Sequence, residues 1–205
     1  MRKINILAGC DSACGEPRKK AATRIFETAR DLFYRRGIRA VGVDEIVGQA
    51  GVTKPSLYRS FESKDDLVAK CLESFAAEGL AGQEARITAA GPEPLAQLRA
   101  LIGYYADEMA QPGFRGCPMS NTAVEFPEEG HPGRLVAEAC KTALRERVVG
   151  LTRQVAADDP DGLADGLILL IEGAYAAHHV FGSQGPANAF VLASERLIAG
   201  HMASR

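Results

Sequence analysis

The stretch from residue 43 to residue 67, VDEIVGQAGVTKPSLYRSFESKDDL, constrains the fold of this chain more than any other segment. Four of its apolar residues recur at helical spacing: Val43, Ile46, Val47 and Ala50. This spacing predicts a helix of about two turns with one apolar face. Gly51 is expected to end the helix, because glycine readily adopts the left-handed conformation that helix C-termini commonly need.

A second short helix is expected directly after this glycine turn. Thr53 has the side chain of an N-cap residue, and Pro55 falls within the first turn, where a missing amide hydrogen does little harm. Leu57 and Phe61 are four residues apart and are predicted to turn inward. The side chains left on other faces are a cation, a hydroxyl, a phenol and a guanidinium: Lys54, Ser56, Tyr58 and Arg59. Such side chains suit contacts with DNA.

A third, longer helix is expected to follow. Ser63 and Asp66 have the spacing of a capping box, which marks the start of a helix. Lys64 falls in its first turn, where free amides and a lysine together would hold a phosphate. Five residues are predicted to form its buried side: Leu67, Val68, Cys71, Leu72 and Phe75.

Over residues 20 to 75 the chain resembles the tetracycline-repressor (TetR) family of bacterial one-component regulators. The resemblance rests on these residues: Thr23, Ile25, Ala29, Phe33, Gly37, Val43, Ile46, Ala50, Gly51, Val52, Leu57, Tyr58, Phe61, Ser63, Lys64 and Leu67. Two positions depart from the family pattern. Gly42 stands where a threonine or serine usually caps the second helix and contacts a phosphate, and Val47 stands where alanine is usual. Neither change removes a residue expected to contact bases.

The resemblance implies an all-α fold, with an N-terminal three-helix helix-turn-helix DNA-binding domain and a larger helical domain for ligand binding and dimerisation. It further implies a homodimer that docks in successive major grooves of a palindromic operator and binds a small-molecule inducer of unknown identity. The expected function is therefore a sequence-specific transcriptional regulator, namely a repressor that its inducer releases. Seven residues are expected to contact DNA: Thr53, Lys54, Pro55, Ser56, Tyr58, Arg59 and Lys64.

The charge distribution agrees with a division into a flexible arm (1–16), a DNA-binding domain (17–64) and a ligand-binding and dimerisation domain (65–205). Residues 17 to 64 hold eleven Lys or Arg against five acids, a balance of about +6, although the net charge of the whole chain is −2. A basic end on an acidic body fits a protein that offers one end to DNA. It disfavours a protein that binds DNA without sequence choice. Three basic residues either contact phosphates or form the solvated start of the first helix: Arg18, Lys19 and Lys20.

The apolar run around Ile4 to Leu7 is too short for a secretory segment, so the protein is expected to be cytoplasmic and to have no membrane partner. Five cysteines, an odd number, without a signal segment indicate reduced thiols rather than a disulfide framework. Cys10 and Cys14 do not have the usual spacing of zinc ligands. No metal and no cofactor are expected.

The rest of the chain is expected to be helical. The helix that starts at Ser63 is predicted to run to Ile87, and the later helices to cover 93–110, 120–126, 134–157, 161–181 and 186–203. Small residues on the last two helices, such as Gly166 and Gly173, allow close helix approach, which indicates a homodimer interface. The alternative is that these helices complete a monomeric core. Operator symmetry, which usually mirrors protein symmetry, favours the dimer.

A ligand pocket is expected in the helical body. Its candidate lining residues are Leu101, Tyr104, Tyr105, Met119, Asn121, Phe126, Tyr175 and His178. The polar residues Asn121, Glu125 and His131 either anchor a ligand or cap and bridge helices. His178 and His179 are adjacent, so a regular helix does not aim both at one metal ion.

Two alternatives to an inducer-released repressor stay open from the sequence. Cys117 follows Arg115 at a junction between helices, and it is either a structural residue or a thiol sensor for oxidants or electrophiles, because a nearby cation favours the thiolate. The alternative of a different class is a small helical enzyme that uses Glu125, His131 or Cys117. Little supports an enzyme, since the sequence has no phosphate loop, no Gly-x-Ser-x-Gly elbow and no His-Glu-x-x-His motif.

Overall fold

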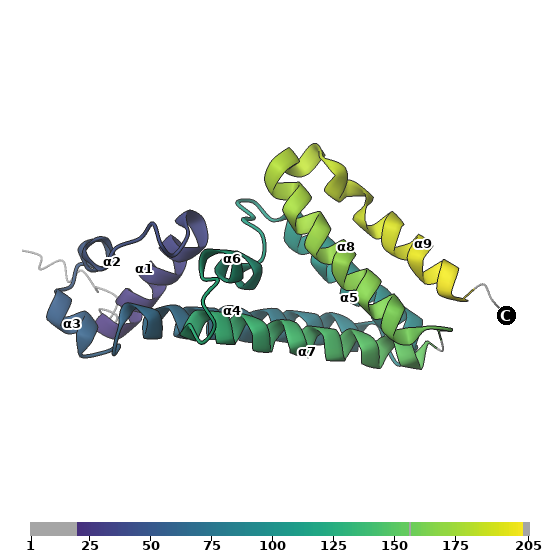
Figure 1. The fold of residues 1–205 in the computed structure, drawn as a ribbon, viewed down its shortest axis with the longest axis horizontal. Helices are drawn as coiled ribbons and strands as arrows, with labels where there is room; N and C mark the ends of the chain where they lie inside the picture. The colour runs from purple at the N-terminus through teal and green to yellow at the C-terminus, as the bar shows by residue number, and fades with distance from the viewer. Residues whose placement is uncertain (1–19, 156, 203–205) are drawn as a thin grey trace, which may run out of the picture.

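The structure of the chain, a computed structural model, describes residues 20–155 and 157–202. Over these ranges the secondary structure is entirely helical, which confirms the predicted all-α fold (Figure 1). No helix in the described ranges is long and apolar enough to cross a membrane. The predicted flexible arm and several residues discussed above lie outside the described residues: Cys10, Cys14, Arg18 and Lys19.

Three short helices form the N-terminal unit: α1 (Ala21–Arg36), α2 (Val43–Ala50) and α3 (Lys54–Tyr58). They pack with the first turns of α4 (Lys64–Ala89). The centre of this unit is closed to solvent, since seven apolar residues are 0% exposed: Ile25, Ala29, Val41, Ile46, Leu57, Leu67 and Val68. Most of the apolar residues that the spacing predicts to face inward are buried, namely Ile46, Val47, Ala50, Leu57 and Phe61, and Val43 is partly buried.

Helix α4 continues into the larger body and joins the two units. It runs beside α7 (Pro132–Gln154), and α5 (Pro94–Ala110), α8 (Pro160–Phe181) and α9 (Phe190–Met202) pack together at the far end (Figure 1). Seven residues that are at most 2% exposed form the centre of this second core: Leu98, Leu101, Val148, Leu163, Ala164, Leu167 and Ile198.

A short helix, α6 (Pro118–Glu125), lies over α4 and α7 between the N-terminal unit and the far end of the body (Figure 1). It starts two residues before the predicted start at Ser120, because the fixed φ of Pro118 suits the first turn of a helix. Met119 and Thr122 are buried, and Met119 belongs to the core of the N-terminal unit. Helix α6 is therefore in contact with both parts of the molecule.

The predicted start of the last helix at Pro186 is wrong. Two short 3₁₀ turns, Gly182–Gln184 and Pro186–Ala189, separate α8 from α9, which begins at Phe190. Gly182 has a φ of +69°, a value that ends a helix and that glycine adopts without strain. The chain thus turns back over two tight 3₁₀ segments before the last helix starts.

Candidate functional site

The turn between α2 and α3 is fixed by backbone geometry. Gly51 has a φ of +61°, and the amide of Val52 donates to the carbonyl of Val47 at 3.0 Å. Arg24 of α1 donates from Nη1 to the carbonyls of Ala50 at 2.9 Å and Gly51 at 3.2 Å. Because the free carbonyls at the end of α2 have partners, the orientation of α3 relative to α2 is defined. This arrangement is a helix-turn-helix.

Thr53 occupies the N-cap position of α3, but its side chain does not cap the helix as predicted. Its Oγ1 instead lies 3.1 Å from Oγ of Ser56, which also accepts a 2.9 Å hydrogen bond from Nη2 of Arg59. Pro55 lies in the first turn of α3, as expected. The hydroxyls of Thr53 and Ser56 and the guanidinium of Arg59 thus form a connected polar row on α3.

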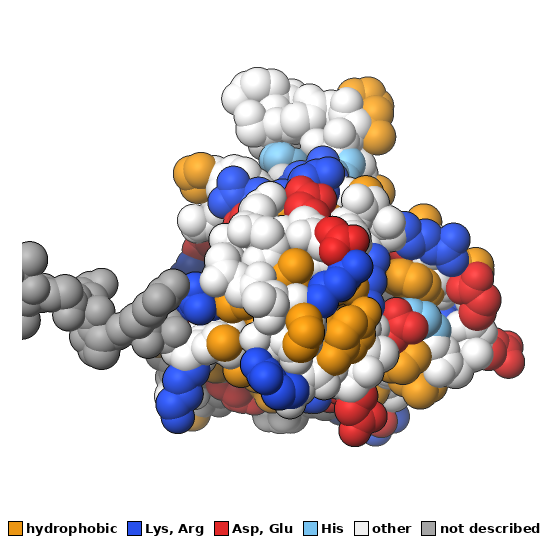
Figure 2. All heavy atoms as spheres, turned by 90° about the vertical axis from the view of Figure 1, so that its left-hand side faces the viewer, with side chains coloured by type: hydrophobic (Ala, Val, Ile, Leu, Met, Phe, Trp, Pro, Cys, Tyr) orange, Lys and Arg blue, Asp and Glu red, His pale blue; other side chains and the backbone are white. Residues whose placement is uncertain are grey.

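The outer face of α3 is exposed and carries charge. Leu57 is fully buried, whereas Tyr58 is 52% exposed. Lys54 forms an exposed 2.7 Å ion pair with Asp44 of α2. Exposed ion pairs contribute little to stability, so Lys54 can exchange this partner for a phosphate or a base at small cost. Figure 2 views the molecule from this end and shows Lys and Arg side chains spread over it among a few carboxylates.

Lys64 braces the loop between α1 and α2. Its Nζ donates to the carbonyl of Ile38 at 2.7 Å, and its partial burial lowers the pKa of Lys64, although nearby carboxylates act in the opposite direction. The predicted cap is present, since Ser63 Oγ accepts from the amide of Asp66 at 3.0 Å. No local pattern in the sequence predicts the contact with Ile38. An ammonium has three donors, so two remain for a phosphate.

Glu125, at the end of α6, holds the same loop from the other side. Its carboxylate accepts hydrogen bonds from the backbone amides of Ile38 at 3.1 Å and Arg39 at 2.8 Å. Gly37 has a φ of +88°, and a Cβ there would lie 3.1 Å from Oε1 of Glu125. Glycine therefore permits both the turn and the close approach of the carboxylate. Of the two predicted roles of Glu125, this geometry corresponds to bridging.

Phe126 and His131 support the junction between α6 and α7. Their rings stack with centroids 3.9 Å apart, and the guanidinium of Arg39 lies 5.0 Å from the centre of the Phe126 ring. Nδ1 of His131 accepts from the amide of Gly133 at 3.2 Å and so caps α7. Phe126, predicted to line the ligand pocket, lies instead at this junction and not in the cavity described next.

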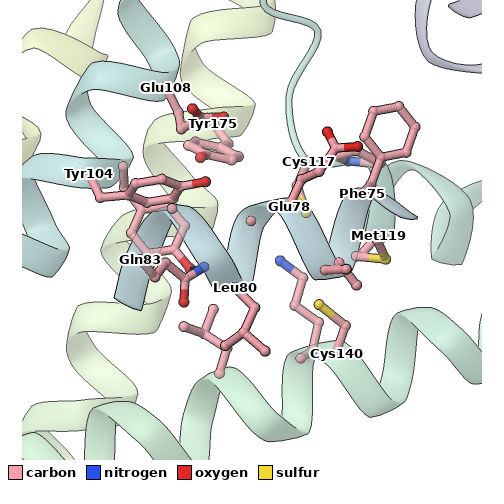
Figure 3. Close-up of a pocket in the computed structure, with 18 of the residues that line it drawn as sticks. Phe75, Glu78, Leu80, Gln83, Tyr104, Glu108, Cys117, Met119, Cys140 and Tyr175 are labelled. Carbon is pink, nitrogen blue, oxygen red and sulfur yellow. Dashed lines mark hydrogen bonds between the residues drawn. The ribbon is translucent and has the colours of Figure 1, made fainter. Parts of the chain in front are cut away.

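A cavity of about 620 Å³ opens among α1, α4, α5, α6, α7 and α8 (Figure 3). Four of the predicted pocket residues line it, together with Cys117: Tyr104, Tyr105, Met119 and Tyr175. The sequence analysis did not predict most of the lining residues on α4 and α7, among them Phe75, Glu78, Gln83, Cys140 and Lys141. It also did not predict Glu108 of α5. The spacing of Phe75, Gly79, Gly82 and Gln83 is a helical pattern that marks the cavity side of α4.

Three other predicted pocket residues do not line this cavity. Leu101 is 1% exposed and belongs to the core of the body. Asn121 donates from Nδ2 to the carbonyl of Arg115 at 2.9 Å and lines a separate, smaller cavity of about 260 Å³. His178 packs edge-on against Phe114, with ring centroids 5.1 Å apart. None of these three residues therefore contributes to the surface of the larger cavity.

The cavity combines paired charges with neutral phenols. Three cations on its wall each form an ion pair with a carboxylate: Arg30 with Glu78, Lys141 with Glu172, and Arg147 with Glu84. Burial, with help from nearby carboxylates, raises the pKa of Tyr104 to about 12. Burial also raises the pKa of Tyr105 and that of Tyr175, so all three phenols stay protonated at neutral pH.

Two thiols, those of Cys117 and Cys140, line the same cavity. Burial alone would lower the pKa of Lys141, but the neighbouring Cys117 and Glu172 raise it, and a hydrogen bond to Cys117 contributes. Burial raises the pKa of Cys140 and raises that of Cys71, outside this cavity, to about 12. In the described part of the chain, no three His, Cys, Asp or Glu side chains are arranged to hold a metal ion.

Comparisons with known proteins match both parts of the chain. The family described as "Bacterial regulatory proteins, tetR family" matches residues 25–71, and the "Tetracyclin repressor-like, C-terminal domain" matches residues 94–193. A TetR-family transcriptional regulator from Streptomyces coelicolor is 32% identical and superposes with a TM-score of 0.80. That superposition covers 88% of this chain and 95% of the other.

Curated relatives agree with the structural match. The HTH-type transcriptional repressor KstR2 of Rhodococcus jostii is 38% identical over 39% of either chain, and the HTH-type transcriptional activator FasR of Mycolicibacterium smegmatis is 31% identical over 62% of this chain and 58% of its own. The transcriptional regulator AcuR of Cereibacter sphaeroides is 31% identical over 68% of this chain and 67% of its own. The chain thus spans less than two thirds of the length of KstR2 and FasR. With its helix-turn-helix and its helical body, the chain belongs to the TetR family and is a DNA-binding transcriptional regulator.

Proposed function

We propose that this regulator is a homodimeric repressor that a small-molecule ligand, bound in the 620 Å³ cavity, releases from a palindromic operator. The observation that carries the proposal is the position of α6. Its first residues, Pro118 and Met119, line the cavity, and its last residue, Glu125, holds the amides of Ile38 and Arg39 in front of α2. A ligand that displaces α6 therefore changes the orientation of the helix-turn-helix.

Repression is the direction of control that this coupling favours. A ligand that turns both recognition helices away from their spacing in successive major grooves weakens DNA binding, so the ligand-free protein is the form that occupies the operator. Among the relatives, KstR2 is named a repressor and FasR an activator. Operator binding places the action of the protein in the cytoplasm.

An exposed apolar stripe on α8 supports dimerisation with a second copy of the chain. Leu169 and Val180 are 73% and 75% exposed, and Gly173 and Ala176 lie between them on the same side of the helix. Leu192 of α9 adds a further exposed apolar side chain at 54%. Monomeric proteins rarely leave such a stripe in water, and one recognition helix occupies only one half-site of an operator.

We infer that α3 is the recognition helix. Lys54, Ser56 and Arg59 lie on its outer side and have the hydrogen-bonding groups that read base edges in the major groove. The other expected DNA contacts are assigned to the sugar-phosphate backbone: Thr53, Pro55, Tyr58 and Lys64. The backbone contacts position the helix, while the base contacts select the sequence.

Titration of the purified protein against the intergenic DNA upstream of its own gene tests the proposal. Fluorescence anisotropy with an excess of unrelated duplex as competitor should give saturable binding with an even number of protomers per site. Displacement of the intergenic DNA by an unrelated duplex at the same concentration as the intergenic DNA would contradict sequence-specific binding. One protomer per saturated site would contradict the dimer.

A second candidate, release through covalent modification of Cys117, is favoured by the position of this thiol in the wall of the cavity, which Lys141 also lines. Cys117 is also the N-cap residue of α6, so an adduct there acts on the same helix as a bound ligand. N-ethylmaleimide is a suitable probe, because the sulfur adds to one carbon of its double bond and the thiol proton ends on the other. The treated wild type should lose operator binding while Cys117→Ser retains it. Equal loss in both proteins would contradict this candidate, and Cys71→Ser serves as the control for a buried thiol.

A further inference from the structure

Among the residues that the structure describes, the charged groups that line the cavity leave one carboxylate without a partner. Each cation on the wall has its own acid, as the pairs of Arg30, Lys141 and Arg147 show. Glu108 also lines the cavity, and its side chain forms no hydrogen bond or ion pair with any residue that the structure describes. Because each ion pair is neutral as a whole, the cavity carries one excess negative charge, which is located on Glu108.

The unpaired carboxylate lies among aromatic rings. The charge of Glu108 adds to the effect of burial in raising the pKa of three phenols, which places it near all of them: Tyr34 of α1, Tyr104 of α5 and Tyr175 of α8. Figure 3 shows Glu108 beside Tyr175 and Tyr104 on one side of the cavity, with Cys117, Met119 and Cys140 on the other. The rings of Phe114 and Tyr175 meet edge-on at 4.8 Å, so the aromatic surface continues beyond the tyrosines.

A cavity with an unpaired carboxylate and aromatic walls favours a positively charged ligand. A carboxylate that is partly removed from water and lacks a counter-charge is unfavourable, as the raised pKa of Glu108 reflects, and a cation that enters the cavity relieves this cost. Electron-rich rings attract the same cation through their quadrupoles. An anionic ligand would have to separate Arg30, Lys141 or Arg147 from its carboxylate to find a partner.

We propose that the cavity binds an organic cation, such as a quaternary ammonium or a delocalised iminium, with its charge against Glu108 and its apolar body among Tyr104, Tyr105 and Tyr175. The inference rests on the proposed role of the cavity as the ligand site and adds the chemical class of the ligand. A bare metal ion does not fit, because a single carboxylate supplies too few ligands. Among the described residues, no three His, Cys, Asp or Glu side chains are arranged to hold a metal ion.

Two dyes that share the xanthene ring system test the charge preference. Tetramethylrosamine is a cation and fluorescein an anion, and fluorescence anisotropy measures the binding of each to the full-length wild type. The informative variant is Glu108→Gln, which removes the charge and keeps the size. The matched control is Glu73→Gln, which removes the same charge from an exposed position of α4 outside the cavity. Glu108→Lys tests reversal of the preference.

The wild type and Glu73→Gln are expected to bind tetramethylrosamine alike, at least about tenfold more tightly than fluorescein. Glu108→Gln is expected to lose about tenfold or more in affinity for the cation without losing affinity for fluorescein, and Glu108→Lys is expected to prefer fluorescein. Circular dichroism of each variant shows whether it is folded. The inference is overturned if folded Glu108→Gln binds the cation as tightly as Glu73→Gln does, or if the wild type prefers fluorescein.

Failure of this inference is distinguishable from failure of the proposed function. Operator titration without dye tests DNA binding alone, and it is repeated with saturating tetramethylrosamine. Operator binding without dye binding would overturn the assignment of the ligand class and leave the repressor proposal standing. Dye binding that leaves the operator affinity unchanged would overturn the proposed release and leave the cation site standing.

Discussion

The carboxylate of Glu125 accepts a 2.8 Å hydrogen bond from the backbone amide of Arg39, which lies 86 residues earlier in the chain. A second hydrogen bond, from the amide of Ile38, engages the other oxygen of the same carboxylate. The side chain at the end of α6 therefore binds backbone amides of the loop before α2. A shift of α6 would act on the loop backbone itself rather than on a flexible side chain. One helix therefore both lines the cavity and contacts the loop before the helix-turn-helix.

Loss of this link should loosen the loop without unfolding the protein. Glu125→Gln replaces one acceptor oxygen by a donor, and a hydrogen bond to a charged group contributes about 1.5–3 kcal/mol. The amides of Ile38 and Arg39 are therefore expected to exchange with solvent about tenfold faster or more, measured by hydrogen exchange with NMR detection. Glu128→Gln is the control, because the carboxylate of Glu128 pairs with the guanidinium of Arg39, whereas the backbone amides of Ile38 and Arg39 donate to Glu125. Unchanged exchange in Glu125→Gln would show that the carboxylate does not hold the loop.

Arg59 and Lys64 should affect DNA binding in different ways. Arg59→Ala is expected to change which operator sequence the protein prefers, because the guanidinium lies on the outer face of α3. Lys64→Ala is expected to weaken binding to all sequences alike and to lower the slope of log affinity against log salt by about one. Binding measured at several salt concentrations, with operators that differ at single base pairs, separates the two effects. A change of sequence preference in Lys64→Ala would contradict the proposal that Lys64 contacts the sugar-phosphate backbone of DNA.

A charge on the apolar stripe of α8 should separate the protomers. Leu169→Lys places an ammonium on a stripe that we propose is buried between two copies, and the cost of burying it without a partner should shift the protein to monomer at micromolar concentration. Leu135→Lys is the control, since Leu135 is also more than half exposed but lies on α7. Sedimentation velocity gives the oligomeric state. A dimer that persists unchanged in Leu169→Lys would place the interface elsewhere.

Two glycines of α7 should respond oppositely to alanine. A Cβ at Gly133 would lie 3.0 Å from Val68 and 3.1 Å from Leu72, so Gly133→Ala is expected to destabilise the protein by about 1–3 kcal/mol through overpacking. A Cβ at Gly150 would have no atom of another described residue within 4 Å outside its own stretch of helix, so Gly150→Ala is expected to stabilise the protein by about 0.5–1 kcal/mol through helix propensity. Urea denaturation at one protomer concentration gives both values. Stabilisation by Gly133→Ala would contradict the close packing at Gly133, and destabilisation by Gly150→Ala would contradict the open space at Gly150.

The helix-turn-helix was predictable because its signals are local. The glycine turn at Gly51, the cap at Ser63 and the inward Leu57 each depend on residues within a few positions, and the structure has all three. The contact of Lys64 with Ile38 spans 26 residues and that of Glu125 with Ile38 spans 87. No local pattern reports such contacts, because they depend on how the helices pack.

The cavity was only partly predictable for the same reason. Leu101 and Tyr105 are four residues apart on α5, yet Leu101 faces the core and Tyr105 reaches the cavity. Periodicity assigns both to the apolar side of a helix, and only the packing of α4 and α8 against α5 separates them. Glu108 was missed because a carboxylate on an amphipathic helix normally marks its solvent face.

Selection of DNA from a randomised pool of duplexes by the purified wild-type protein tests the central claim most directly. A dimeric helix-turn-helix regulator should enrich one palindromic motif whose half-sites are centred about one helical turn apart or a multiple of it. The enriched duplex should then bind two protomers, or a multiple of two, in the presence of excess unrelated DNA. Enrichment of no motif, or of a single unpaired half-site bound by one protomer, would contradict the account.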